Sequence, residues 1–369
     1  MRPDFRYDPG VDRRTPFLCA FLALAGLSGC ATVESGGTAP ATYANPVLDT
    51  DFPDPAVLRA TDGYYYAYAT QTTTAEGRTL NIQVARSRDL AQWEHLGDAL
   101  PTKPTWASRT QDFWAPHVHE DNGRYYLYYS AKPDAALTDT TRGLCLAVAT
   151  AERPEGPFTD IGQPLQCGPG FVNIDPMAYD DPATGRRLLY WGSGFGPIKV
   201  QELAPDRISF APGSAPVDLL PAVPSEDPNE YQRLVEGAWV VRRDGWYYLF
   251  YSGDNCCGPN AHYAALIARS RSATGPFETL AQASGGGNSV ILERRGIWVA
   301  PGHNSVATDA CGRDWIVYHA VDSRRPRTRP TDDVNTRRVM LIDPLVWREG
   351  WPRVEGPSTG PRPSPTSSC

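Results

Sequence analysis

The sequence has 369 residues, and its 35 Lys and Arg against 42 Asp and Glu give a formal net charge of −7 at pH 7. A chain of this length can bury a large core, as one large domain or as two. It contains no basic run that would follow a phosphate backbone, so we expect no nucleic acid partner. A neutral ligand such as a sugar polymer is compatible with this charge balance.

The N-terminus is typical of an exported protein. Arg13 and Arg14 precede an apolar stretch, residues 17–27, which is too short to span a bilayer and has the flanks of a signal peptide. The next residues, Ser28-Gly29-Cys30, complete a pattern that resembles a bacterial lipobox. We therefore predict a signal peptide over residues 1–30 and lipidation of Cys30, with an ordinary signal peptide as the alternative. The expected product is a cell-envelope lipoprotein, periplasmic or on the cell surface, and otherwise a secreted protein.

Composition also predicts where the folded domain begins and ends. Residues 31–44 are rich in Ala, Thr, Gly and Ser, which is typical of a flexible linker. Residues 356–369 are rich in Pro and Ser, and we expect them to be disordered. The folded domain is therefore predicted over residues 45–355. Within it, the adjacent Cys256 and Cys257 indicate a structural loop whose pairing the sequence leaves open.

Five segments of this domain share a glycine turn followed by aromatic and β-branched residues. Asp-Gly or Asn-Gly between two β-rich runs is the strongest short-range hairpin signal, because both turn residues tolerate positive φ. The spacing is regular, with 60, 62, 60 and 67 positions between consecutive turn glycines, which are Gly63, Gly123, Gly185, Gly245 and Gly312.

Further β-rich runs follow three of these hairpins. Residues 85–87, 147–149 and 268–270 look like third strands, and no long apolar pattern of helical period occurs after the leader. Each repeat is thus three or four short antiparallel strands that cannot bury both faces alone. Five such repeats of roughly 60 residues predict an all-β, five-bladed β-propeller, and a β-sandwich is the alternative.

Counting back nine or ten positions from each turn glycine reaches the start of the preceding strand. Equivalent positions on five blades lie on one ring around the central axis. The residues found there are Asp54, Trp114, Asp175, Glu236 and His303.

Three carboxylates that converge on one ring have a chemical consequence. They repel one another, so their pKa values are driven apart and one group stays protonated while another is ionised. This is what glycoside hydrolysis requires, since one carboxylic acid protonates the leaving oxygen and another carboxylate activates water. Singly, Asp54 and Asp175 read as turn residues before proline, and His303 as a core histidine. Trp114 is suited to stack on a sugar ring.

With these residues in view, the whole domain resembles glycoside hydrolase family 43, the group of arabinanases, α-L-arabinofuranosidases and β-xylosidases. Five motifs carry the resemblance in order, one per blade. They are Asp-Pro-Ala-Val at Asp54, Phe-Trp-Ala-Pro at Phe113, Ile-Asp-Pro at Ile174, Val-Glu-Gly at Val235 and Pro-Gly-His-Asn-Ser at Pro301.

The resemblance implies an inverting mechanism. In it, Asp54 is the general base, Glu236 the general acid, and Asp175 the residue that orients Glu236 and raises its pKa. The base and the acid of an inverting enzyme lie roughly 6.5–9.5 Å apart, which leaves room for the attacking water.

Within the family, the chain resembles the arabinan-cleaving members in particular. The resemblance implies that the substrate is α-1,5-linked arabinan or arabino-oligosaccharide. It also suggests, as a hypothesis, a calcium ion near the axis, beside His303 and held through waters, although no cofactor is expected to be required. It also supplies candidate substrate-binding residues, which are Phe113, Trp114, Asn173, Ser193, His303 and Arg338.

Three other interpretations remain open at this stage. An exo-acting α-L-arabinofuranosidase and a β-xylosidase acting on arabinoxylan share the same carboxylates. A carbohydrate-binding propeller without catalysis is the alternative from another class, and the unpaired central acids argue against it. In each case we expect a plant cell-wall polysaccharide or oligosaccharide as the partner, a monomeric protein, and no contact with a membrane except through the lipid anchor.

Overall fold

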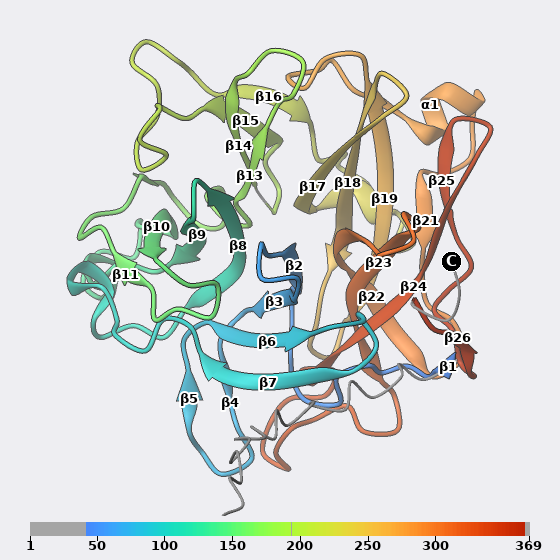
Figure 1. Ribbon diagram of the computed structural model, residues 1–369, viewed down its shortest axis with the longest axis horizontal. Coiled ribbons are helices and arrows are strands. Elements are labelled where there is room, and N and C mark those ends of the chain that lie inside the picture. The colour runs from blue at the N-terminus through green and yellow to red at the C-terminus, as the bar shows by residue number, and fades with distance from the viewer. Residues whose placement is uncertain (1–41, 193, 366–369) are drawn as a thin grey trace, which may run out of the picture. The chain divides into compact units, whose positions relative to one another are not determined.

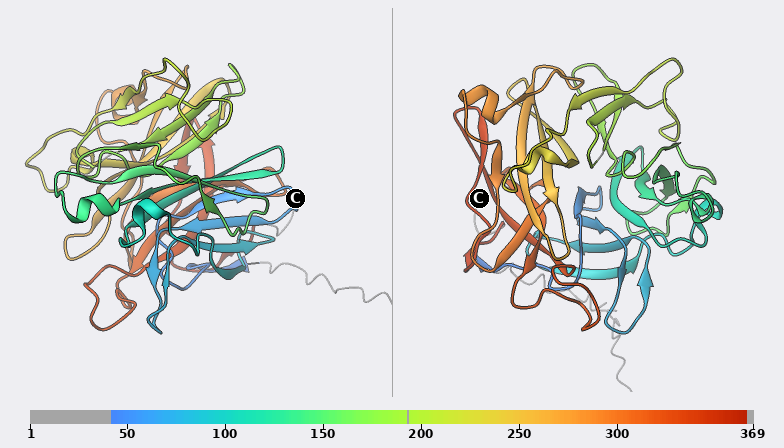
Figure 2. Two further views of the ribbon diagram at one scale, coloured as in Figure 1. Left: turned by 90° about the vertical axis from the view of Figure 1, so that its left-hand side faces the viewer. Right: turned by 180° about the vertical axis from the view of Figure 1, so that it is seen from behind.

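The computed structural model describes residues 42–192 and 194–365, and these residues are almost entirely β-structure. Five antiparallel sheets of four or five strands follow one another along the chain. The first strands of the five sheets contact one another in a closed ring (Figure 1), and the side view in Figure 2 shows the sheets as successive layers. This confirms the predicted five-bladed β-propeller.

Each blade is a meander in which consecutive strands pair. Blade one contains β2 (Ala56–Arg59), β3 (Tyr65–Ala69), β6 (Gln83–Ser87) and β7 (Trp93–Asp98). Blade two contains β8 (Phe113–Asp121), β9 (Arg124–Ala131), β10 (Cys145–Ala151), β11 (Thr159–Asp160) and β12 (Gln166–Cys167), which pairs with β10. Blade three contains β13 (Met177–Asp180), β14 (Arg187–Trp191), β15 (Ile198–Glu202) and β16 (Val217–Leu220).

The last two blades have the longest strands. Blade four contains β17 (Val235–Arg243), β18 (Trp246–Asn255), β19 (His262–Ser270), β20 (Glu278–Thr279) and β21 (Val290–Leu292), which pairs with β19. Blade five contains β22 (Trp298–Thr308), β23 (Asp314–Asp322), β24 (Arg338–Arg348) and β25 (Trp351–Val354).

Few elements lie outside the blades. A small hairpin, β4 (Thr72–Thr73) with β5 (Thr79–Leu80), projects from blade one, and β1 (Thr42–Tyr43) pairs with β26 (Arg362–Pro363). The helical elements of the described residues are α1 (Leu280–Ser284) and three 3₁₀ turns at Thr105–Ala107, Asp134–Leu137 and Tyr231–Arg233. Within the described part of the chain, no helix is long and apolar enough to cross a membrane.

The five predicted turn glycines each lie between the first two strands of a blade. All five have positive φ, from 73° at Gly185 to 86° at Gly63, a conformation that glycine adopts without steric cost. The three predicted third strands also form, within β6, β10 and β19. The repeat spacing in the sequence therefore predicted the order and the approximate positions of the strands.

Adjacent blades are joined by buried side chains and by tyrosine hydroxyls. The hydrophobic clusters lie between neighbouring sheets rather than within one sheet. In four successive blades a tyrosine of the second strand donates to a backbone carbonyl in the next blade, at 2.6 or 2.7 Å. The donors are Tyr68, Tyr128, Tyr190 and Tyr248. Such hydrogen bonds satisfy buried hydroxyls and fix the angle between sheets.

The ring closes where the N-terminal segment meets blade five. The Val47 amide donates to the Met340 carbonyl at 3.0 Å, and the Met340 amide donates to the Leu48 carbonyl at 3.3 Å. The Phe52 amide donates to the Arg338 carbonyl at 2.7 Å. These contacts occupy the part of β24 that β25 leaves unpaired, because β25 pairs only with the second half of that strand. The segment then enters blade one, so the two ends of the repeat array are held together.

Two predicted boundaries need correction. Thr42 and Tyr43, expected in the flexible linker, form β1, and residues 356–365, expected to be disordered, are ordered against blade five. The reason is local: the Ser358 carbonyl accepts from Trp298 at 2.9 Å and its amide donates to Asp343 at 3.2 Å, so this segment supplies partners for buried polar groups. The predicted signal peptide, the Cys30 lipidation site and residues 31–41 of the linker lie outside the described residues.

We predict that Arg207→Ala destabilises the fold. Arg207 is buried between blades two and three, where it donates to both oxygens of Asp180 at 2.8 and 2.6 Å and to Asp121 at 3.0 Å. Because both carboxylates are partly exposed and water can replace part of the interaction, we expect a loss of about 1–3 kcal/mol in the free energy of unfolding. Urea denaturation measures this loss.

The matched control is Arg86→Ala, which removes an exposed ion pair with Glu94 at 2.8 Å. We expect it to cost less than about 1 kcal/mol. Equal losses in the two variants would contradict the role given to Arg207 in joining the blades.

Candidate active site

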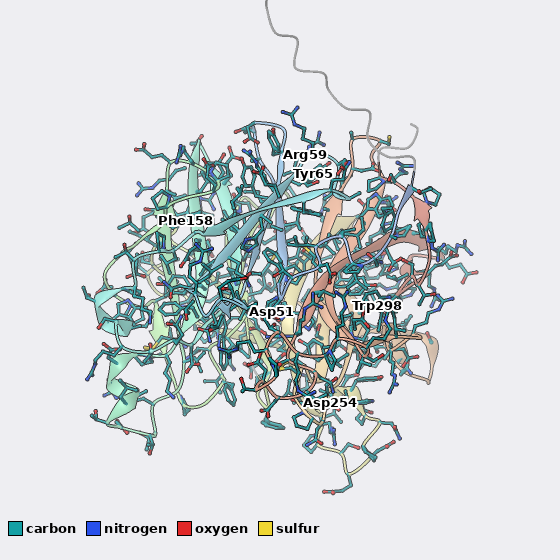
Figure 3. All side chains as sticks on the ribbon, turned by 90° about the horizontal axis from the view of Figure 1, so that it is seen from below. Asp51, Arg59, Tyr65, Phe158, Asp254 and Trp298 are labelled. Atoms are coloured by element: carbon teal, nitrogen blue, oxygen red, sulfur yellow. A yellow bond between two sulfur atoms is a disulfide. The ribbon has the colours of Figure 1, made fainter. Side chains whose placement is uncertain are left out.

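A pocket of about 350 Å³ contains all five predicted ring residues. Its polar lining residues include Asp54, Asp175, Glu236, His303 and Arg338, and its apolar lining residues include Trp114, Phe171, Ile174, Leu234, Cys256 and Cys257. Asp254 also lines it, and in Figure 3 Asp254 lies at the opposite end of the molecule from Arg59 and Tyr65, which flank the first hairpin turn. The pocket is therefore at the end of the propeller where the first strands begin.

The backbone at these strand starts is irregular in a repeated way. Asp54, Asp175 and His303 have φ of 59°, 59° and 48°, and in blades two and four the residue that follows the ring residue, Ala115 or Gly237, has φ of 43° or 64°. Register shifts occur at the same places in β8, β17 and β22. Left-handed residues and β-bulges redirect a strand locally, and they cluster at functional sites because they aim side chains.

Asp54 is a buried carboxylate with a full set of partners. It accepts hydrogen bonds from Thr70 at 2.5 Å and from Arg338 at 3.0 Å, and the His303 Nδ1 lies 3.4 Å from its Oδ1. Burial alone would raise the pKa of Asp54, but the charge of Arg338, with His303 and His319, holds this pKa well below its usual range. Asp54 is therefore ionised at neutral pH.

The pKa of Glu236 is shifted in the opposite direction from that of Asp54. Burial raises the pKa of Glu236 to about 7, and the charge of Asp54 acts in the same direction. A hydrogen bond of 2.7 Å from the Tyr263 hydroxyl, together with the charge of Arg338, limits the rise. Near neutral pH Glu236 thus retains a proton that it can donate.

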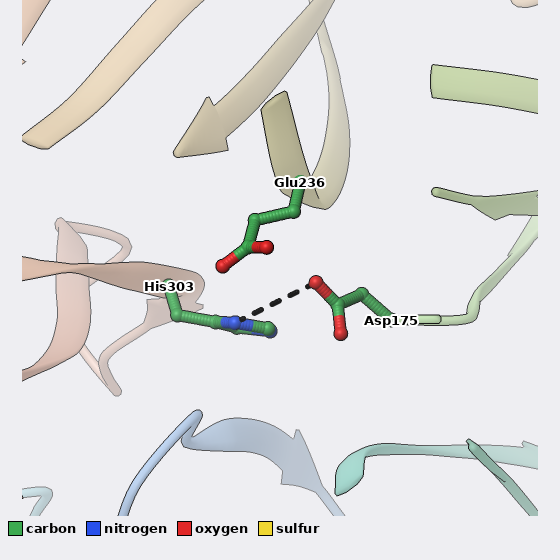
Figure 4. Close-up of side chains that lie close together, drawn as sticks. All are labelled: Asp175, Glu236 and His303. Carbon is green, nitrogen blue, oxygen red and sulfur yellow. Dashed lines mark ion pairs between the residues drawn. The ribbon is translucent and has the colours of Figure 1, made fainter. Parts of the chain in front are cut away.

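Asp175 lines the same pocket as these two groups and contacts the backbone that follows Glu236. Its Oδ2 accepts from the Gly237 amide at 3.0 Å and is 3.9 Å from the His303 Nδ1. Burial, and then the charges of Glu236 and Asp54, raise the pKa of Asp175 well above its usual value. Figure 4 shows Asp175, Glu236 and His303 directed toward one another. One carboxylate oxygen of each acid and one ring nitrogen of His303 lie within 4.8 Å of one another.

Two of the predicted substrate-binding residues are not in the pocket. Phe113 is fully buried in the core, where it stacks on Tyr129, and Asn173 is 2% exposed beneath the chain at Gly168. The reason for Phe113 is strand alternation, since it and Trp114 point to opposite faces of β8. Trp114, His303 and Arg338 do line the pocket, and Ser193 lies outside the described residues.

The structure adds Phe171 to the aromatic wall. Its ring stacks on Trp114 with centroids 5.8 Å apart and planes at 23°, and its side chain is 51% exposed. Phe171 lies in the loop between blades two and three, and no repeat spacing marks it. An aromatic residue in a Gly- and Pro-rich loop shortly before Asp175 is the signal from which sequence reasoning could have identified it.

The second addition is His319, a fully buried residue of β23. Its Nδ1 lies 3.1 Å from the Asp54 amide, which donates to it, and its ring stacks on Tyr263 with centroids 5.7 Å apart. Burial lowers the pKa of His319 to about 4, so it is neutral. It connects the backbone of Asp54 with the tyrosine that donates to Glu236.

We predict that Tyr263→Phe raises the pKa of Glu236 above about 7. The tyrosine hydroxyl donates to the ionised carboxylate and stabilises that form, so its removal favours the protonated acid. The measurement is a pH titration of the ¹³C-labelled glutamate carboxyl by NMR. The control is Tyr251→Phe, which changes a buried tyrosine of neighbouring β18. A Glu236 titration that is unchanged, or that shifts equally in both variants, would contradict this electrostatic account.

Comparison with known proteins identifies the family. Residues 43–352 match the model of glycosyl hydrolases family 43. The extracellular exo-α-(1→5)-L-arabinofuranosidase ArbA of Cellvibrio japonicus is 28% identical over an alignment of 333 positions, which covers 85% of this chain and 89% of that protein. The extracellular endo-α-(1→5)-L-arabinanase 1 of Bacillus subtilis is 27% identical over 310 residues, with 81% and 86% covered.

Solved structures agree with the sequence comparison. A thermostable family-43 glycoside hydrolase is 31% identical, with a TM-score of 0.71 and coverage of 88% of this chain and 99% of that one. The α-L-arabinanase of Cellvibrio cellulosa is 25% identical, with a TM-score of 0.65 and coverage of 83% and 95%. Since the family model spans most of the chain and these relatives share its fold, the protein belongs to glycosyl hydrolase family 43 and is a glycosidase.

Proposed function

We propose that the protein cleaves α-1,5-linked arabinan or arabino-oligosaccharides with inversion of the anomeric centre. The observation that carries the mechanism is the separation of protonation states in one pocket, with Asp54 ionised beside Arg338 and the pKa of Glu236 raised to about 7. The substrate class is supported by the relatives from C. japonicus and B. subtilis, whose names specify α-(1→5)-linked arabinose.

In the proposed reaction Glu236 is the general acid and Asp54 the general base. Glu236 donates its proton to the glycosidic oxygen as the bond to the anomeric carbon breaks. Asp54 takes a proton from a water molecule that attacks the opposite face of the sugar. The products are the freed alcohol and a hemiacetal of inverted configuration, and the acid and the base then exchange a proton with solvent.

Asp175 acts as a positioning residue in this proposal. Its hydrogen bond to the Gly237 amide fixes the peptide that follows Glu236, and so the direction of the acid. After burial, the charge that raises the pKa of Glu236 is that of Asp54, and the pKa of Asp175 is itself raised by burial and by the charges of Glu236 and Asp54. The part of Asp175 in raising the pKa of Glu236 stays a prediction from the family resemblance, and the hydrogen bond to Gly237 supports its orienting role.

The walls of the pocket suit a sugar ring. The polar lining residues can bind hydroxyls, and the Trp114–Phe171 pair offers an aromatic surface for the apolar face of a furanose. A volume of about 350 Å³ is at the small end of ligand pockets, which fits a short stretch of oligosaccharide rather than a long one.

The proposal requires no cofactor. Calcium prefers six to eight oxygen ligands, whereas the groups around His303 include two carboxyls with raised pKa values and Asp54, which already accepts from Arg338. These residues fit a calcium cage poorly, and we route no step through an ion. Calcium held near His303 through waters stays a prediction from the family resemblance.

We also propose that the protein is exported and acts as a monomer on plant cell-wall polysaccharide. Both arabinose-specific relatives are named as extracellular, which agrees with the predicted signal peptide. Lipidation of Cys30 stays a prediction, to be checked by mass spectrometry of the mature N-terminus.

We predict that the wild type releases arabinose or arabino-oligosaccharides from linear arabinan and that Asp54→Ala and Glu236→Ala lose this activity. Each variant removes one partner of the proton transfers, so the expected fall in kcat/KM is roughly 10²–10⁴-fold or more. The measurement is product analysis on linear arabinan and on arabinoxylan. Asp244→Ala, which changes an exposed carboxylate of a hairpin turn, is the control and retains activity.

The product pattern distinguishes the alternatives. Internal arabino-oligosaccharides indicate endo action, monomeric arabinose indicates an exo-arabinofuranosidase, and xylose indicates a β-xylosidase. Full activity of either carboxylate variant, or the absence of product from every pentosan, would overturn the proposed roles or the proposed substrate class.

A further inference from the structure

The adjacent cysteines 256 and 257 are bonded to each other and line the same pocket as Asp54, Asp175 and Glu236. They lie in the β18–β19 loop of blade four, and both are half-buried. Glu236 pairs with Ser252 on β18, so the strand next to the acid leads directly into this loop. The sequence had indicated only a structural loop here.

This disulfide contributes little to the stability of the fold through chain closure. A disulfide stabilises mainly by restricting the unfolded chain, and the effect grows with the length of the loop that it closes. A bond between neighbouring residues closes no such loop. A stabilising role therefore does not account for it.

The loop is held by other interactions. Asp254, near the end of β18, binds Arg233 at 2.7 Å and the His262 Nδ1 at 2.6 Å. At its other side the Gly258 amide donates to the Asn335 carbonyl and the Asn335 side chain donates back to Gly258, both at 3.2 Å. The carboxylate of Asp254 is thus already paired, and the other residues of this segment that line the pocket are Asn255 and the two bonded cysteines.

We propose that the Cys256–Cys257 disulfide is a sugar-binding wall of the pocket. A disulfide is a polarisable, largely apolar surface with no strong hydrogen-bond donor. It suits the C–H face of a pentose ring whose hydroxyls point to the polar groups, and it complements the aromatic surface of Trp114 and Phe171. The inference rests on the proposed function, and it identifies the disulfide as a further group that positions the sugar in the pocket.

The test is the double variant Cys256→Ser with Cys257→Ser, which keeps the side-chain size but removes the bond and its apolar surface. On arabino-oligosaccharides we expect KM to rise roughly tenfold, as for the loss of one apolar side-chain contact, while kcat changes less than about threefold. Asn260→Ala changes an exposed residue of the same loop that does not line the pocket, and it should leave both constants unaltered. An unchanged KM in the serine variant would overturn the proposal.

A second measurement keeps the proposal testable if the double variant does not fold. In a crystal structure of Glu236→Gln with bound arabino-oligosaccharide, a sugar carbon within about 4.5 Å of a Cys256 or Cys257 sulfur supports the wall, and a sugar bound away from both sulfurs contradicts it.

The failure of the proposed function is distinguishable from the failure of this inference. A wild type that cleaves neither arabinan nor arabino-oligosaccharides refutes the proposed substrate class. The KM comparison is then made on the aryl pentoside that the wild type does cleave, α-L-arabinofuranoside or β-D-xylopyranoside. A selective rise in KM for the serine variant on that substrate still supports the wall, and an equal KM refutes it.

Discussion

The ion pair between Arg338 and Asp54 determines the electrostatics of the pocket. Asp54 is buried, and without a neighbouring cation its carboxylate would take up a proton. The Arg338 guanidinium, 3.0 Å away, keeps it ionised, and the resulting negative charge helps to raise the pKa of Glu236. One interaction therefore supports two opposite protonation states a short distance apart. Acid–base hydrolysis of a glycosidic bond depends on that difference.

The propeller brings these groups together from distant parts of the chain. Asp54 begins blade one, Glu236 lies in blade four, and Arg338 begins the third strand of blade five, where the N-terminal segment closes the ring. The amide of Phe52 donates to the Arg338 carbonyl at 2.7 Å, and the Asp51 carboxylate accepts from the Arg338 amide at 3.0 Å. The contacts that close the ring are thus the same contacts that place the cation beside the base.

Much of this arrangement could be predicted from the sequence because it repeats. The turn glycines occur at nearly constant spacing, and an offset of nine or ten positions from them reaches Asp54, Asp175 and Glu236, since equivalent positions on blades share a ring. What does not repeat was missed. Phe171 and the Cys256–Cys257 wall lie in loops of irregular length, and His319 is on a second strand where most neighbours are core.

The incorrect predictions have equally local causes. Phe113 was assigned with Trp114 from one motif, although adjacent residues of a strand face opposite sides. The tail was judged by its Pro and Ser content, which does not reveal that Ser358 accepts a hydrogen bond from buried Trp298. In both cases residue type alone was the basis of the prediction, whereas the position of the residue in the fold decides its contacts.

The most direct test of the account is the anomeric configuration of the first product. Early ¹H NMR spectra of arabinan digestion, recorded before mutarotation, report whether the newly formed reducing end is α or β. Direct attack by water activated by Asp54, on the face opposite to the leaving group protonated by Glu236, predicts the β-anomer from an α-linked substrate. Initial release of the α-anomer would contradict the single-displacement mechanism and the roles given to the two carboxylates.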